Sequence, residues 1–176
     1  MDVRVTAGDI AKFDADLVVV NLFEGVSVPG GATGAVDQAL GGAISQLIQL
    51  GDIRGKAGEL TTIHTLGKIP APRVLVAGLG KSRDFDVDAV RNLAANVIRA
   101  VRKPGIRRIA TIVHGAGIGG LDPAAATQAV AEGSVLGDYR FLRHKAASAE
   151  NGDEKREIES LTIVEHDESR VAAMTA

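Results

Sequence analysis

The sequence predicts an α/β fold, a three-layer α/β/α sandwich around a mixed, mostly parallel sheet. Apolar runs of strand length alternate along the chain with segments of helical periodicity. The runs at 17–22 (LVVVNL) and 74–77 (VLVA) are continuously apolar, which is typical of strands buried on both faces. Hydrophobic residues make up 45% of the chain but aromatic residues only 3%, so Val, Ile, Leu and Ala must build the core. That composition favours helices packed on a Val-rich sheet.

Six segments have the length and composition of strands. Alternation at 3–6 and the apolar run at 17–22 define the first two, which could be neighbours in one sheet. The remaining strands are expected at 59–64, 73–77, 108–114 and 161–164. Right-handed crossovers would connect the parallel pairs.

The clearest helix is predicted at 86–102, after the glycines that we expect to end the strand at 73–77. Its apolar residues recur every three or four positions, and Asp86 or Asp88 can cap its first turn. A second pattern at 35–50 is divided by Gly41 and Gly42 into two short helices. A third helix at 123–136 has proline in its first turn.

Three further segments are expected to lack a buried face. Residues 24–34 form a glycine-rich exposed loop of the kind that often carries function. Residues 141–159 are strongly polar and indicate a surface excursion or linker. Residues 167–176 begin a helix that ends before it buries anything.

Composition and charge exclude several classes of protein. The formal net charge is -2 and no basic cluster is present, so we expect no nucleic-acid partner. The absence of cysteine excludes disulfides and thiolate metal sites. The first residues do not form a leader, and no run approaches the roughly 20 apolar residues that span a bilayer. We therefore expect a soluble, cytoplasmic protein without a membrane partner.

Two glycine motifs resemble phosphate-binding loops. The sequence at 78–82 (GLGKS) resembles the end of a P-loop, but Leu75 stands where that loop needs glycine, so these glycines are predicted to be structural. Gly115, Gly117 and Gly120 match GxGxxG, yet the acidic residue expected about 20 residues on is missing. A nicotinamide oxidoreductase is therefore disfavoured. Two alternatives stay open for this loop, an anion cradle at a helix N-terminus and a purely structural turn.

Histidine and serine spacing predicts neither a metal site nor a hydrolytic triad. The four histidines lack HxH or HxxxH spacing and are interpreted as strand-end or solvated residues: His64, His114, His144 and His166. No serine has an elbow sequence.

Three segments, 41–59, 74–101 and 129–145, together resemble the N-terminal domain of the leucyl aminopeptidase family, and the resemblance extends over about 18–164. It implies a macro-domain-like α/β fold beside a separate C-terminal catalytic domain. That domain holds two divalent metal ions (Zn or Mn), and the enzymes are typically hexamers. None of its catalytic motifs occurs here, so the resemblance implies no catalytic residue, metal ligand or cofactor in this chain. On this basis residues 1–166 form the macro-like domain and residues 167–176 a tail or linker toward the catalytic domain.

The macro-domain likeness also implies a site for ADP-ribose. Asp9 in Gly8-Asp9-Ile10 matches the aspartate that contacts adenine, Asn21 matches the first asparagine of a strand-end motif, and 115–120 resembles the diphosphate loop. Residues 29–34 stand in place of the family's glycine-rich catalytic loop. The candidate ligand-binding residues are Asp9, Ile10, Asn21, Gly31, Gly115, Ala116, Gly117, Ile118, Gly119 and Gly120.

Two departures from the macro-domain pattern bear on function. Leu22, Phe23 and Glu24 replace Ala-Ala-Asn, and Thr33 stands where ADP-ribosyl hydrolases have an aspartate, so hydrolysis of ADP-ribose links ranks last. Our first hypothesis is a non-catalytic structural and regulatory domain, inactive alone, whose partner is a C-terminal peptidase domain or a partner chain. The alternative is a stand-alone module that binds ADP-ribose or a nucleotide phosphate. Homo-oligomer formation is also expected from the resemblance.

Overall fold

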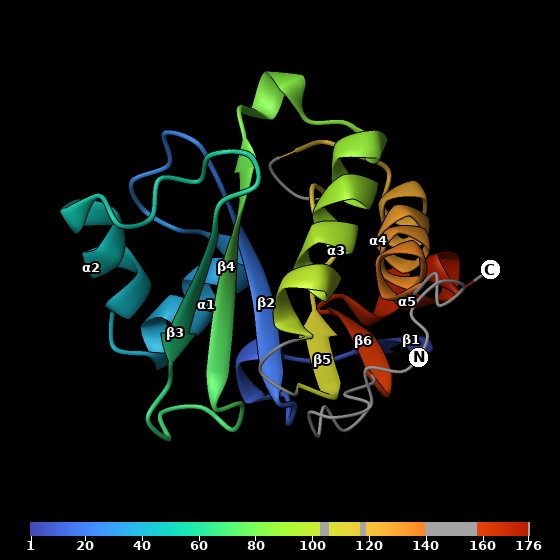
Figure 1. Cartoon of the computed structure of the whole chain (residues 1–176), viewed down its shortest axis with the longest axis horizontal. Coiled ribbons are helices and arrows are strands. Elements are labelled where there is room, and N and C mark those ends of the chain that lie inside the picture. Colours follow the sequence, from blue (N-terminus) through green and yellow to red (C-terminus); the bar gives the residue numbers. More distant parts are fainter. Residues whose placement is uncertain (103–105, 117–118, 140–157, 176) are drawn as a thin grey trace, which may run out of the picture.

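The computed structural model describes residues 1–102, 106–116, 119–139 and 158–175 (Figure 1). Within these ranges six strands form one sheet, with helices on both of its faces. The strands are β1 (Asp2–Ala7), β2 (Leu17–Phe23), β3 (Leu60–His64), β4 (Arg73–Gly80), β5 (Arg108–Thr111) and β6 (Ser160–Glu165). The α-helices are α1 (Gly31–Ala39), α2 (Ala43–Leu50), α3 (Val87–Val101), α4 (Pro123–Asp138) and α5 (Glu168–Met174), and two short 3-10 helices are η1 (Ile10–Lys12) and η2 (Ser82–Asp84).

The strand order is β1-β6-β5-β2-β4-β3, and every neighbouring pair is parallel except β3 with β4. This confirms the mixed, mostly parallel sheet. The expectation that the first two strands could be neighbours is wrong, because β1 pairs with β6 while β2 lies between β5 and β4. Burial explains the difference. β2 is apolar on both faces and takes the centre, whereas β1 alternates between exposed and partly buried residues and takes an edge.

Alternate residues of β2 enter two separate hydrophobic cores. Leu17 and Val19 pack with the residues of α3 and α4, while Val18 and Val20 pack with those of α1 and α2. Figure 1 shows α3 in front of the sheet and α1 behind it. The continuous apolar run in the sequence therefore has the cause that we expected, burial on both faces.

Helices α3 and α4 approach closely because α4 presents small residues to α3. Ala129, Gly133 and Gly137 recur every four positions, so they share one face of the helix. A Cβ atom added at Gly133 would lie 2.1 Å from the carbonyl oxygen of Arg91, and one at Gly137 would lie 2.7 Å from Cα of Ala95. Glycine is thus required at this contact for space and not for its dihedral angles.

Several predicted boundaries shift in the structure. β4 continues through Gly78 and Gly80, the glycines expected to end it. A neighbouring segment passes so close here that a Cβ atom at Gly78 would lie 2.0 Å from the carbonyl oxygen of Lys56. Both glycines are therefore structural, as predicted for 78–82. β5 ends at Thr111, three residues before the expected His114. The helix pair divided at Gly41 and Gly42 is confirmed, although α1 begins at Gly31, inside the predicted loop.

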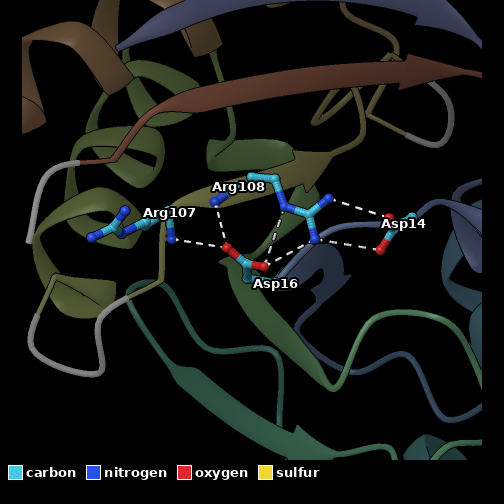
Figure 2. A network of polar contacts seen from close by, with 4 residues as sticks. All are labelled: Asp14, Asp16, Arg107 and Arg108. Carbon is cyan, nitrogen blue, oxygen red and sulfur yellow. Dashed lines mark hydrogen bonds and ion pairs between the residues drawn. The ribbon is translucent and has the colours of Figure 1, made fainter.

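One carboxylate joins the starts of β2 and β5 (Figure 2). Oδ2 of Asp16 accepts hydrogen bonds from the main-chain amides of Arg107 (3.1 Å) and Arg108 (2.8 Å), and Oδ1 accepts from the Arg108 guanidinium. Burial alone would raise the pKa of Asp16, but the hydrogen bonds from Arg108 and Arg107 hold that pKa below its ordinary value. Asp14 adds an exposed ion pair with the same guanidinium.

The chain leaves the adjacent strands β2 and β5 toward opposite faces of the sheet. β2 leads to α1 on one face, and β5 leads to α4 on the other. Such a switch point opens a crevice at the carboxyl ends of parallel strands, which is the usual place for ligands in open α/β sheets.

Candidate functional site

A cleft with two lobes lies at this switch point. The first lobe, of about 250 Å³, is lined by the ends of β2 and β6, the segment after β5 and the N-terminus of α1. The second lobe, of about 360 Å³, is lined by the segment around Asp9 and by α1. The lobes share five residues, Gly31, Ala32, Ile112, Val164 and His166, so they form one continuous groove.

Most of the candidate residues from the sequence line this groove. Asp9 and Ile10 line the second lobe, and Gly31 lines both. The first lobe is lined by Asn21, Gly115, Ala116 and Gly119. Gly120 lies outside the lining of either lobe, and Gly117 and Ile118 lie outside the described residues.

The carboxylate of Asp9 already makes two contacts within its own turn. Its Oδ1 accepts a hydrogen bond of 3.0 Å from the amide of Ala11 and caps η1, while Oδ2 lies 3.4 Å from Nζ of Lys12. The side chain retains 36% exposure. It can therefore accept a further hydrogen bond from a ligand in the second lobe, although the pairing with Lys12 offsets part of its charge.

A chain of polar side chains runs from Asn21 at the cleft into the protein. Nδ2 of Asn21 donates to Nδ1 of His114 (2.9 Å), whose Nε2 lies 3.2 Å from Oγ1 of Thr111. With Nδ1 accepting, the proton of the neutral ring is on Nε2, which donates to Thr111. Burial lowers the pKa of His114 to about 4, so the ring is neutral at physiological pH. His114 thus lies three residues after the end of β5 and is buried, so it is neither the strand-end nor the solvated residue that was expected.

The first turn of α1 holds a threonine where a hydrolase would need a carboxylate. Oγ1 of Thr33 donates a 2.8 Å hydrogen bond to the carbonyl oxygen of Asn21 and so fastens α1 to β2. The nearest carboxylate on α1, Asp37, is buried and accepts from the amides of Ile44 (2.7 Å) and Ser45 (3.0 Å) at the start of α2. Both side chains are committed to packing the helices.

The glycine loop after β5 is closely packed against Phe85, which lies between η2 and α3. Gly115 has φ +83°, and a Cβ atom there would lie 2.6 Å from the ring of Phe85. A Cβ atom at Gly119 would lie 2.7 Å from the carbonyl oxygen of Gly115. Both glycines therefore let the loop close on itself beside the first lobe, a structural role that leaves their amides near the cleft.

Sequence reasoning missed three polar residues of the first lobe. Glu165, His166 and Arg170 line it from the end of β6 and from α5. The sequence predicts a strand-end or solvated position for His166 and no buried residue in 167–176, yet Met174 is buried. The available signal was the position of His166 directly after a strand, since parallel strands end at one edge of the sheet. His64 is exposed at the end of β3, and His144 lies outside the described residues.

Two absences concern the described residues alone. Within residues 1–102, 106–116, 119–139 and 158–175, no three carboxylate, histidine or cysteine side chains come together as a metal site would require. In the same ranges, none of the helices has the length and apolar character needed to cross a bilayer.

Comparison with known sequences identifies the family of this chain. The model of the cytosol aminopeptidase family, N-terminal domain, matches residues 19–148. A probable cytosol aminopeptidase of Alkaliphilus metalliredigens is 32% identical over 93% of this chain, and one of Roseiflexus castenholzii is 35% identical over 93%. The matches cover 32% and 30% of those proteins, so the chain spans about a third of the length of the curated relatives it matches.

Comparison with solved structures finds the same fold in two settings. A mutant tomato leucine aminopeptidase aligns with a TM-score of 0.73 at 20% identity, covering 99% of this chain and 35% of that one. A Trypanosoma brucei macrodomain in complex with ADP aligns with a TM-score of 0.73 at 16% identity, covering 98% and 67%. At these identities the likeness shows the macro-domain-like fold alone.

Proposed function

The chain belongs to the cytosol aminopeptidase family, as its N-terminal domain, and from this premise we propose that it is a non-catalytic structural and regulatory module. It acts beside a peptidase portion, which is either a further part of the same chain or a partner chain. Residues 1–166 form the module and residues 167–176, which contain α5, lead toward that portion. The observation that carries the proposal is the match of residues 19–148 to the N-terminal domain of relatives about three times as long.

Three polar side chains near the cleft are used inside the protein, which supports a structural role. The buried His114 is neutral, and both of its ring nitrogens are hydrogen-bonded, to Asn21 and Thr111. It therefore offers no general base to a ligand in the cleft. Thr33 and Asp37 are committed to internal hydrogen bonds. In the family that the chain resembles, divalent metal ions belong to the peptidase portion, and we propose that this chain holds none. We also propose a cytoplasmic location and an oligomeric whole protein.

The reading frame downstream of Ala176 tests this assignment. We expect it to continue into a segment with clustered Asp, Glu and Lys, or a separately encoded peptidase to co-purify with the chain. A stop codon directly after Ala176, together with no co-purifying peptidase, would contradict the proposal.

A second candidate function is the binding of ADP-ribose or a similar nucleotide. The observation that favours it is the continuous groove, with Asp9 at one end and Asn21, Gly115 and Gly119 at the other. A nucleotide with its base near Asp9 would have its phosphates near the glycine loop.

Calorimetry with ADP-ribose tests the second candidate. Ala32 lines both lobes, so Ala32→Phe is expected to abolish the heat of binding, while Ala100→Phe, exposed on α3, leaves it unchanged. Absence of heat with the unsubstituted chain at about 1 mM ligand, together with an unchanged melting temperature, would remove this candidate.

A further inference from the structure

The first lobe of the cleft combines two charged side chains with a largely apolar wall. Its described charged side chains, Glu165 and Arg170, both come from one stretch, the end of β6 and α5. The apolar part of its wall is formed by Leu22, Phe23, Val26, Ile112, Val113 and Val164. A ligand that fits this lobe therefore has an apolar body and a charged head.

The carboxylate of Glu165 and the guanidinium of Arg170 can each still bind a ligand. Oε1 of Glu165 accepts a 3.0 Å hydrogen bond from the amide of Asp167, which leaves Oε2 for another donor. Nε of Arg170 lies 3.4 Å from Oδ2 of Asp167, and among the described residues this ion pair does not involve its two Nη groups. The Arg170 side chain is 51% exposed, so it can reach a ligand without leaving a buried position.

The pairing of charges selects the class of ligand. A diphosphate would meet the carboxylate of Glu165 as a like charge, and a simple amine would meet the guanidinium of Arg170 in the same way. A zwitterion satisfies both, with its ammonium group at Glu165 and its carboxylate in a bidentate contact with Arg170. The volume of about 250 Å³ lies just below the range that holds drug-sized ligands.

We infer that the first lobe binds a free α-amino acid with an apolar side chain, the class of product that an aminopeptidase releases. This inference rests on the proposed function and names its regulation. Arg170 belongs to α5, which packs against α4 and β1 and forms the last described helix of the domain. An amino acid held by Arg170 stabilises α5 in its docked position. The concentration of this product would thereby influence the peptidase portion of the proposed function.

Calorimetry on the 176-residue chain tests the inference with L-leucine as the probe. We expect saturable binding with a dissociation constant of about 1 mM or below. L-leucinamide lacks the carboxylate, 4-methylpentanoate lacks the ammonium group and glycine lacks the apolar side chain, so each is expected to bind at least about tenfold more weakly. Arg170→Gln and Glu165→Gln are each expected to weaken leucine binding by a similar factor, with Arg170→Lys intermediate.

Arg99→Gln, an exposed change on α3, is the matched control and should leave the affinity unchanged. Equal melting temperatures show that the variants fold. Absence of heat with about 10 mM leucine, equal binding of leucinamide, or unchanged affinity in both Arg170→Gln and Glu165→Gln would overturn the inference. Binding of ADP-ribose without any response to leucine would also overturn it. None of these outcomes affects the reading-frame test, so the two proposals fail separately.

Discussion

The side-chain amide of Asn21 donates a 2.9 Å hydrogen bond to Nδ1 of His114 and joins the end of β2 to the segment after β5 directly beneath the cleft. The two residues are 93 positions apart in the sequence. The side-chain amide of Asn21, which matches the first asparagine of the macro-domain strand-end motif, is therefore already hydrogen-bonded inside the protein. The buried imidazole of His114 stabilises this contact between β2 and the segment after β5 only while the ring remains neutral.

Stability is expected to fall with acidification through His114. The pKa of His114 is about 4 in the folded state and near 6.5 when the chain is unfolded, so the unfolded state binds more protons between these values. This contribution is complete above pH 6.5 and is lost as the pH falls to about 4, by roughly 3 kcal/mol in the free energy of unfolding. Urea unfolding at several pH values should show a flatter profile for His114→Gln. Parallel profiles would contradict the assignment, and the exposed His64→Gln serves as control.

Removal of the Asp16 carboxylate should loosen the starts of β2 and β5. Asp16→Ala leaves the amides of Arg107 and Arg108 without their acceptor and is expected to cost about 2 kcal/mol in urea unfolding at pH 7 (Figure 2). Asp14→Ala removes an exposed ion pair of the same Arg108 and should cost less than about 0.5 kcal/mol. Equal losses in the two variants would show that the main-chain hydrogen bonds of Asp16 contribute little.

The difference between wild type and Asp16→Ala should also depend on pH. The folded pKa of Asp16 is lowered, so its contribution is present above the ordinary value near 3.8 and is lost as the pH falls through the folded value. The two unfolding curves are therefore expected to converge only at strongly acid pH. Convergence already between pH 5 and 6 would contradict this origin.

An added methyl group at Gly133 should separate α3 from α4. Alanine normally stabilises a helix relative to glycine by about 1 kcal/mol, but a Cβ atom here would lie 2.1 Å from the carbonyl oxygen of Arg91. We expect Gly133→Ala to destabilise the fold by about 2 kcal/mol or more, measured by thermal and urea unfolding. Gly30→Ala, where no atom lies within 4 Å of the added group, is the control. A stabilised Gly133→Ala variant would disprove the close contact.

The sequence was sufficient for the class of fold and for most elements. The apolar run of β2 has one physical explanation, burial on both faces, and Asp86 caps α3 as predicted by accepting from the amide of Ala89. The position of β1 was not predictable in this way, because its partner β6 lies at the far end of the chain. The start of α1 was missed because its N-cap, Gly30, forms no side-chain hydrogen bond.

Only part of the candidate site was predictable from the sequence. Asp9, Asn21 and Gly115 were accessible through family resemblance, and the structure brings them to one groove. Glu165 and Arg170 carried no local signal, because their proximity to β2 depends on the insertion of β6 between β1 and β5. Long-range strand order therefore determines which charges face the cleft.

The most direct test of the account is an assay of leucine anilide hydrolysis by the purified 176-residue chain with Mn²⁺ or Zn²⁺. The account predicts release of the anilide product at the rate of metal-containing buffer without protein. Metal-dependent hydrolysis that co-elutes with the chain in gel filtration and disappears with a chelator would contradict it.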